Sequence, residues 1–304
     1  MKYLNRYMIM FILLTGLFAC NEDKLFEGEL YKKVFALIST DDYNIFTVVH
    51  DLDFTESVGY VAASVGGSNP TEKDINITLA QDIELFDSYN KDNYDMDQDK
   101  FAHLLSPDKY DIDNYNFSIP AGEKSGRMKI RIRPDGLSPD SVYFISLKVD
   151  AFSTYEVNPE KNDILYRVII KNRYATQEST TNYSLRGALN NVQIPGIKPM
   201  HPISKNKVRI MAGTIPFQSD IATINQSAIL LEIDDNNKVS ISSYKDMEVE
   251  QIDGDPDFPN IYKIEKDDYG KQFKTFLLKY NYKVGSAVNQ MKEELRLEFK
   301  EDNY

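Results

Sequence analysis

Alternating apolar and polar residues run through most of the chain and predict β-strands. The longest such stretch spans residues 274–284. Its apolar positions are Phe276, Leu278, Tyr280 and Tyr282, and its polar positions are Lys279, Asn281 and Lys283. Successive side chains of a strand point to opposite faces of a sheet, so this strand has an inside and an outside.

Similar patterns predict strands in both halves of the chain. In the first half they cover residues 31–38, 48–65, 74–79, 115–119, 128–133, 142–149 and 164–171. In the second half they cover residues 183–189, 207–212, 228–233, 238–243, 247–252, 261–265, 274–284 and 294–300. Helical patterns are short and occur at residues 83–89, 101–105 and 286–292. Many short strands without long helices predict an all-β protein that begins with an antiparallel β-sandwich.

The segment from Arg173 to Asn182 lacks apolar periodicity and is rich in Ser, Thr and Asn. This composition is typical of a linker. We therefore predict a first domain at residues 31–173, a linker at residues 174–182 and a second β-domain at residues 183–304. The second domain is expected to be another β-sandwich or a flattened barrel.

The chain begins with a targeting pattern. Lys2 and Arg6 precede an apolar run from Met8 to Ala19. This arrangement is typical of a signal peptide, predicted at residues 1–19. The run is shorter than the roughly 20 residues that cross a bilayer, which disfavours a transmembrane helix. Cys20, the single cysteine of the chain, follows directly, so an internal disulfide is excluded.

Residues 17–20, Leu-Phe-Ala-Cys, resemble a bacterial lipobox. The resemblance implies that Cys20 carries a diacylglycerol and that residues 20–30 form a lipidated tether. More than one acyl chain gives stable anchoring. An ordinary secretory signal with an incidental cysteine is the alternative. Residues 21–23, Asn-Glu-Asp, resemble the export signal of Bacteroidetes lipoproteins, which implies an outer-membrane anchor facing the cell exterior.

The net charge of the chain excludes some classes of binding partner. Removal of residues 1–19 takes the basic residues from 35 to 33 and leaves 47 acidic ones, a net charge of −14. Such a chain repels phosphate backbones, so nucleic acid is not expected as a partner. It also repels anionic lipid, so the lipid anchor has to bind the membrane.

Four stretches of the first half form a recognisable set. They are residues 31–38, 104–110, 118–123 and 155–161, with the sequences YKKVFALI, LLSPDKY, SIPAGE and YEVNPEK. In this order they resemble the Ig-like domain of unknown function that opens many Bacteroidetes glycan-utilisation lipoproteins, including those of the endo-β-N-acetylglucosaminidase type. Residues 276–282 and 293–297 resemble the β-domain often found behind it. The resemblance implies an N-terminal Ig-like antiparallel β-sandwich followed by a second β-domain.

The resemblance also implies a function, namely non-catalytic capture of an oligosaccharide or polysaccharide beside an outer-membrane importer of the Sus-like type. In some relatives a glycoside hydrolase barrel follows the first domain. About 120 residues follow the linker here, against roughly 250 for such a barrel, so we expect no enzyme. The alternatives are a structural surface protein, either a fimbrial subunit or an adhesin, and a hydrolase with a new site. The first arginine after the signal is Arg127, inside the first domain, which argues against fimbrial maturation.

Motifs for other chemistry are lacking. His50, His103 and His201 are scattered, so we expect no metal site and no cofactor, and no catalytic residue is assigned. Two acidic clusters, at residues 95–99 and 253–257, could bind calcium or could be solvated loops. The first cluster is no EF-hand, because Lys100 and Ser106 occupy the positions of the required Gly and Glu.

A glycan site combines an aromatic face, which stacks on a sugar ring, with amides and carboxylates that bind hydroxyl groups. The loops of the second domain supply candidates of both kinds. The aromatic candidates are Tyr244, Phe258, Tyr262 and Tyr269, and the polar ones are Asp255, Asp257 and Asn260. Each aromatic could instead pack in the core or at its rim. Whether the second domain or the domain interface carries the site is left open by the sequence.

Overall fold

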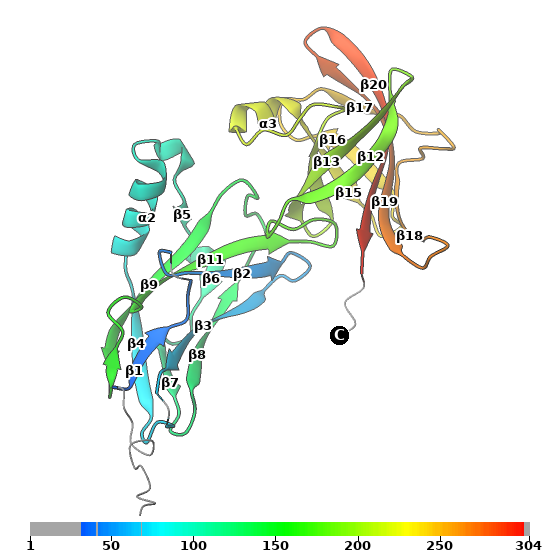
Figure 1. Ribbon diagram of the computed structural model, residues 1–304. Coiled ribbons are helices and arrows are strands. Elements are labelled where there is room, and N and C mark those ends of the chain that lie inside the picture. The colour runs from blue at the N-terminus through cyan, green and yellow to red at the C-terminus, as the bar shows by residue number, and fades with distance from the viewer. Residues whose placement is uncertain (1–31, 41, 68, 301–304) are drawn as a thin grey trace, which may run out of the picture.

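The structure, a computed structural model, describes residues 32–40, 42–67 and 69–300 (Figure 1). The predicted signal peptide at residues 1–19, the predicted lipid attachment at Cys20 and the tether at residues 20–30 lie outside these ranges. Within them, no helix has the length and apolar character that crossing a membrane requires.

The first domain is a sandwich of two sheets. The first sheet has the strand order β10 (Glu156–Val157), β1 (Val34–Leu37), β3 (Ser57–Val65), β8 (Ser125–Ile132) and β6 (Tyr110–Asp111). The second has the order β2 (Ile45–Asp51), β11 (Asp163–Lys171), β9 (Tyr143–Phe152), β4 (Ile75–Gln81) and β7 (Asn116–Ile119), and β5 (His103–Leu104) also pairs with β9. Inward side chains of both sheets, such as Val61, Ile77 and Ile130, are fully buried and form one core. This confirms the predicted β-sandwich.

Three strand pairs of this domain are parallel and add to the expected antiparallel pattern. They are β1 with β10, β2 with β11, and β5 with β9. The β2–β11 pair is the longest, running from Ile45 beside Leu165 to Asp51 beside Lys171. The strand that closes the domain therefore lies beside one of its first strands, and the beginning and end of the domain are joined.

The helix predicted around residues 83–89 is present as α2 (Glu84–Tyr94). It covers the outer face of the second sheet, where Phe86 packs on Phe144 of β9 with ring centroids 6.5 Å apart. The helical turn predicted at residues 101–105 is wrong, because this segment pairs with β9 as the short strand β5. The 3₁₀ turns η3 (Gln98–Lys100) and η4 (Pro107–Lys109) flank that strand.

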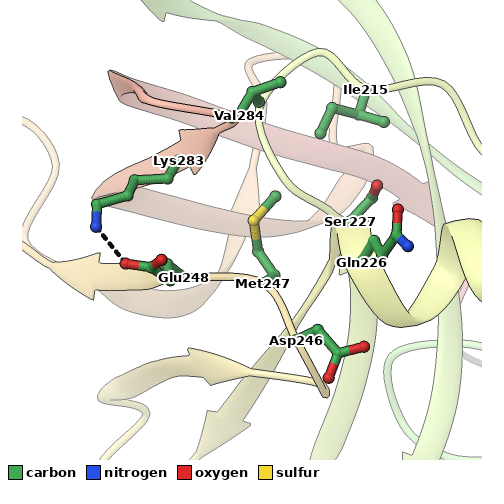
Figure 2. A pocket seen from close by; sticks show the side chains of 9 residues that line it. Ile215, Gln226, Ser227, Asp246, Met247, Glu248, Lys283 and Val284 are labelled. Carbon is green, nitrogen blue, oxygen red and sulfur yellow. Dashed lines mark hydrogen bonds and ion pairs between the residues drawn. The ribbon is translucent and has the colours of Figure 1, made fainter.

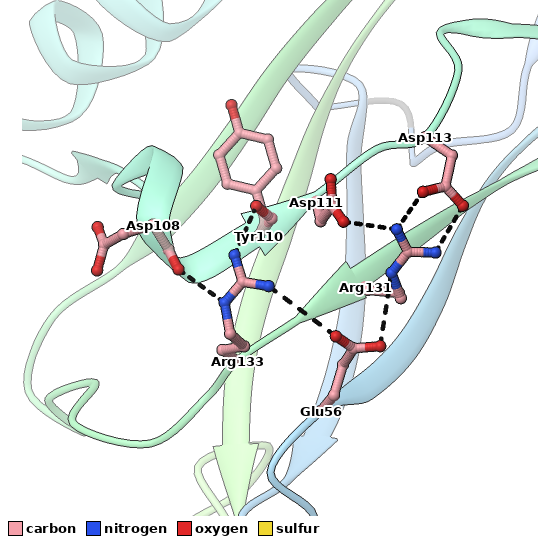
Figure 3. A network of polar contacts seen from close by, with 7 residues as sticks. All are labelled: Glu56, Asp108, Tyr110, Asp111, Asp113, Arg131 and Arg133. Carbon is pink, nitrogen blue, oxygen red and sulfur yellow. Dashed lines mark hydrogen bonds and ion pairs between the residues drawn. The ribbon is translucent and has the colours of Figure 1, made fainter.

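A network of charged groups fastens the short edge strand β6 to β8 (Figure 3). The Arg131 guanidinium donates to Asp111 and Asp113, each at 2.5 Å, and lies 3.5 Å from Glu56. Arg133 donates to the carbonyl oxygens of Asp108 at 2.8 Å and Tyr110 at 3.1 Å. The carboxylates of Asp111, Asp113 and Glu56 are thus engaged by Arg131 and stabilise the fold.

The second domain is one strongly curled sheet of nine strands. In order they are β16 (Val239–Ser243), β15 (Ala228–Ile233), β14 (Lys207–Met211), β13 (Val192–Ser204), β12 (Thr181–Leu189), β20 (Ala287–Phe299), β19 (Gln272–Val284) and β17 (Val249–Gln251), with β18 (Ile261–Lys266) also on β19. The edges β16 and β17 meet where the Ile241 amide donates to the Gln251 side chain at 2.7 Å. The sheet is thus a nearly closed barrel, and the predicted all-β, two-domain fold is confirmed. The helix α3 (Ile221–Ser227) lies beside it.

The alternation predicted for residues 274–284 is confirmed in β19. Phe276, Leu278 and Tyr280 are fully buried, and Tyr282 is nearly so. The helix predicted at residues 286–292 is wrong, because these residues start the strand β20. That strand pairs with β12 on one side and β19 on the other. Pairing with β19 along the whole strand, and with β12 from Met291 on, outweighs the helical preference of a Gln-Met-Lys-Glu run.

The segment between the domains is fastened to both of them. The Asn172 side chain donates to the carbonyl oxygens of Ser204 at 2.7 Å and Lys207 at 3.0 Å in the second domain. The Gln177 side chain donates to the carbonyl oxygens of Pro139 at 3.0 Å and Ser141 at 3.2 Å in the first. The junction is therefore braced by hydrogen bonds from both directions.

Candidate functional site

Both domains line a cleft of about 810 Å³. Its first wall is the segment between α2 and β5, together with the start of β9. Its second wall is the loop that leads into α3, and Figure 1 shows α2 and α3 facing each other across this side of the molecule. The lining residues are Tyr94, Asp97, Asp99, Lys100, Phe101, His103, Asp140, Ser141, Val142, Ser219, Asp220, Ile221 and Ala222.

The first wall carries partly exposed rings. Tyr94 and Phe101 lie with ring centroids 6.3 Å apart, and the exposed ring of His103 lies 5.9 Å from Tyr143. Such rings offer apolar faces on which the apolar face of a sugar can stack. The wall therefore has the stacking surfaces that the sequence analysis placed in the second domain.

Local interactions hold this wall in shape. The helix α2 ends at Asp95, whose positive φ of 51° turns the chain sharply. The buried side chain of Asn90 then accepts a hydrogen bond from the Ala102 amide at 2.8 Å and donates one to the Ala102 carbonyl at 3.2 Å. These two bonds fix residues 95–102 against the helix, so the rings keep their places.

The second wall is formed by the start of α3. The Asp220 carboxylate accepts hydrogen bonds from the amides of Ala222 at 3.0 Å and Thr223 at 3.1 Å, which is an N-cap. The Thr223 hydroxyl, followed by these backbone amides, lowers the pKa of Asp220. Beside it Ile221 is 54% exposed and adds an apolar contact.

A buried ion pair closes the base of the cleft. Arg209 of β14 donates two hydrogen bonds to Asp140 of the first domain, at 2.5 and 2.6 Å, and its guanidinium is 1% exposed. The Tyr244 ring lies 5.0 Å from the same guanidinium. Nearby, the ring of His201 packs on Phe217 at 4.6 Å, and burial lowers the pKa of His201 to about 4.

The predicted aromatic residues of the second domain do not form one site. Tyr262 is 3% exposed and packs in the core against Tyr174 and Phe276, so it offers no face to a ligand. Tyr269 is 91% exposed in the turn between β18 and β19. Phe258 is half-buried, with Lys292 at 5.9 Å from its ring. Tyr244 lies at the domain junction instead.

The predicted polar residues are largely occupied by the fold. Asn260 is fully buried and bonds the carbonyl of Ile252 at 2.8 Å and the amide of Lys279 at 2.8 Å. Asp255 forms ion pairs with Lys279 at 2.8 Å and Lys292 at 2.9 Å, and Asp257 is exposed. In the part of the chain that the structure describes, no group of three or more His, Cys, Asp or Glu is placed to hold a metal ion.

The wall residues Tyr94, Phe101 and His103 were not among the sequence candidates. Their segment is polar and acidic, which is also typical of a solvated loop. A signal was present nonetheless, since two aromatic residues bracket the acidic run in Tyr94 to Phe101, YDMDQDKF.

A second hollow, of about 300 Å³, lies in the second domain next to α3 (Figure 2). Met247 lies at its centre, and Lys283 pairs with Glu248 at one side. None of its nine lining residues is aromatic. It therefore lacks the stacking surface that the interdomain cleft has.

Comparison with known proteins agrees with the two-domain architecture. One family model, described as an N-terminal domain, matches residues 30–156, and another, described as a C-terminal domain, matches residues 162–296. The second match begins just before β11, although β11 pairs within the first sandwich. No curated protein sequence matches the chain.

Solved structures from Bacteroides share the fold along nearly the whole chain. A protein of unknown function from Bacteroides ovatus has a TM-score of 0.65 at 15% identity, covering 90% of this chain and 98% of that one. A Bacteroides ovatus multidomain protein that includes DUF1735 has a TM-score of 0.62 at 14% identity, covering 87% and 94%. An auxiliary nutrient binding protein from Bacteroides thetaiotaomicron has a TM-score of 0.58 at 12% identity, covering 86% and 94%. At sequence identities of 12–15%, these similarities show a shared fold.

Proposed function

We propose that this protein is a lipid-anchored protein of the outer surface that binds an oligosaccharide or polysaccharide without catalysis and delivers it to an outer-membrane uptake system of the Sus-like type. The observation that carries the proposal is the interdomain cleft. It brings partly exposed rings and carboxylates together in one hollow, a combination that suits recognition of a sugar.

Two further observations support this proposal. The fold is that of proteins from Bacteroides, one of which is an auxiliary nutrient binding protein. The Cys20 lipobox and the acidic residues behind it would hold the protein at the membrane where nutrients arrive. An importer would be the natural neighbour of such a protein.

Binding without hydrolysis is supported by the partners of three of the four carboxylates that line the cleft. Glycosidases use a pair of carboxyl groups, one of which is a general acid with a raised pKa. Here Asp97 pairs with Lys100 at 2.7 Å, Asp140 pairs with Arg209, and Asp220 caps α3. The hydrogen bonds of the cap lower the pKa of Asp220, which is the opposite of what a general acid needs.

The test is a binding screen of the fragment from residue 21 to residue 304 against soluble plant and host glycans, by affinity electrophoresis and then calorimetry. For a glycan that binds, Tyr94→Ala and His103→Ala should each weaken binding by about 10-fold, the scale of one lost stacking contact. Phe54→Ala is the control, because Phe54 is 62% exposed outside the cleft.

The other outcomes of this screen would point to a different site or a different function. Loss of binding in Tyr269→Ala, with Tyr94→Ala binding normally, would move the site to the second-domain turn. Release of reducing ends from a bound glycan would replace the binding function with hydrolysis. No binding by a folded fragment to any glycan of the screen would contradict the proposal and favour a structural surface protein.

A further inference from the structure

The interdomain cleft does not end at the walls described so far. A neighbouring hollow, of about 690 Å³, lies between α2 and the segment of residues 95–104, and it shares Phe101 and His103 with the cleft. Another hollow, of about 360 Å³, lies next to the start of α2 and shares Leu104 with this neighbouring hollow. The three hollows therefore adjoin in sequence along β5, and we call this series the β5 track.

The far end of the β5 track carries two buried polar atoms that make no hydrogen bond within the described residues. Ser146 of β9 is 5% exposed, and its hydroxyl has no hydrogen-bond partner in the described structure. The Oδ2 atom of Asp82 also makes no hydrogen bond, and its interaction is a long ion pair with Lys148 at 3.9 Å. Both residues line the hollow of about 360 Å³. Leaving a buried polar group unsatisfied costs about 1 to 3 kcal/mol, so such atoms indicate a place where a ligand's hydroxyl groups could bond.

Apolar surface accompanies these atoms. The partly exposed ring of Tyr110 lines the same hollow, above the fully buried Phe144, and Leu104, at its junction with the neighbouring hollow, is 44% exposed. Alternation along β9 places Ser146 on the same side of the sheet as Phe144, the side that α2 covers. A sugar ring, with one apolar face and hydroxyl groups at its edge, fits this combination of ring and acceptor.

The charges along the β5 track select the kind of chain. Carboxylates line each of the three hollows: Asp82, Asp87, Asp95, Asp97, Asp99, Asp140 and Asp220. Three of these carboxylates, on Asp82, Asp97 and Asp140, are ion-paired with Lys148, Lys100 and Arg209. The excess of negative charge is therefore that of Asp87, Asp95, Asp99 and Asp220 over the remaining lysine, Lys91. A chain that carries carboxylates or sulfates would be repelled along this length, whereas neutral hydroxyl groups could donate to it.

From these observations we infer that the β5 track binds an extended segment of a linear, neutral glycan, with several successive sugars in adjoining subsites between the interdomain cleft and Ser146. This inference rests on the proposed function and adds the substrate class. A polymer bound along its length is recognised by internal sugars and requires no free chain end.

The experiment uses calorimetry with gluco- and manno-oligosaccharides from the disaccharide to the hexasaccharide. Affinity should rise with chain length until the track is filled. Ser146→Ala should bind the hexasaccharide about 3- to 10-fold more weakly, the scale of one neutral hydrogen bond, and Asp82→Asn should weaken it at least as much. Binding of the disaccharide, held in the cleft, should be unchanged. Heparin and polygalacturonate should not compete.

Ser146→Ala removes an unpartnered hydroxyl, so the fold should be as stable as before, and Ser240→Ala on an exposed strand position is the control. Equal affinity for the trisaccharide and the hexasaccharide, or normal hexasaccharide binding by both Ser146→Ala and Asp82→Asn, would overturn the inference. The proposed function would survive that result if Tyr94→Ala still weakened binding. Failure of every oligosaccharide and polysaccharide to bind would instead overturn both.

Discussion

Arg209 of the second domain and Asp140 of the first are joined by two hydrogen bonds at the base of the interdomain cleft. Both side chains are nearly excluded from water, at 1% and 9% exposure. A charge that is desolvated in this way depends on its partner, because neither water nor another group can replace it. The relative placement of the two cleft walls therefore depends on this pair.

Replacing Arg209 with Met should destabilise the folded protein by about 3 kcal/mol, since Asp140 then keeps a charge without its partner. Urea unfolding would measure this loss, and small-angle scattering should show a wider spread of domain arrangements. The control is Lys271→Met. Lys271 pairs with Glu298 in an exposed position, where an ion pair contributes about 1 kcal/mol or less. Equal losses in both variants would show that the buried pair has no special role.

A second buried charge pair lies inside the barrel. Lys198 of β13 pairs with Glu293 of β20, and Glu293 accepts a further hydrogen bond from Tyr280 at 2.8 Å. The Tyr280 hydroxyl in turn accepts one from the Gly213 amide at 2.9 Å. Burial lowers the pKa of Lys198, which shows how much its charge needs the carboxylate.

Glu293→Gln should therefore cost about 3 to 5 kcal/mol of stability in urea unfolding, because Lys198 is left as an uncompensated buried charge. The double variant Lys198→Met with Glu293→Gln should recover part of that loss. Glu248→Gln, which breaks an exposed pair with Lys283, should change stability by about 1 kcal/mol or less. A double variant no more stable than Glu293→Gln would contradict the role assigned to the lysine charge.

The stability of the protein should fall as the pH drops from about 6.5 to 4. Burial lowers the pKa values of His50 and His201 to about 4, from the usual 6.5. In this interval the unfolded chain takes up protons that the folded protein does not, so each histidine costs roughly 3 kcal/mol of stability by the lower limit. His50→Gln should remove one of these contributions and flatten the dependence of unfolding free energy on pH. An unchanged slope in that variant would refute the assignment.

Gly59 on β3 is predicted to tolerate no side chain. A Cβ atom at this position would lie 1.7 Å from the Tyr166 hydroxyl, which is hydrogen-bonded to His50 at 3.1 Å. Gly59→Ala should displace Tyr166 and lower stability by about 1 to 3 kcal/mol or more in thermal unfolding. Gly66→Ala is the matched control, since its Cβ would meet only the Val34 carbonyl at 3.7 Å. A loss of the same size in both variants would exclude the clash as the cause.

The sequence pattern identifies most clearly the strands whose inward positions are apolar, such as β19. One long strand of the barrel, β13, was missed, and β20 was predicted only from residue 294 on, because inward positions of both strands carry charged residues. In β20 the buried series Met291, Glu293 and Leu295 includes an acid. In β13 it includes Lys198 between prolines at 195 and 199. The two charges compensate each other only after the strands are paired, and a linear pattern cannot show this.

The candidate site was harder to predict for a related reason. Its rings come from a loop beside α2, and its base is the contact of Asp140 with Arg209, residues 69 positions apart. The loops of the second domain had the right composition, yet Asn260 and Tyr262 are buried there by contacts with β19. Composition indicates which residues could bind a sugar, whereas burial decides which of them a sugar can reach.

The strand β11 has a practical consequence for anyone who divides this chain. It pairs with β2 and β9 of the first domain, and Leu165, Tyr166, Val168 and Ile170 are almost fully buried by those contacts. A fragment that starts at residue 162 would carry this strand with both hydrogen-bonding edges open and its apolar faces in water. Such a strand is a template for intermolecular β-pairing. The fragment that starts at residue 162 should therefore aggregate. A fragment that starts at residue 172 lacks β11 and should not aggregate through this strand.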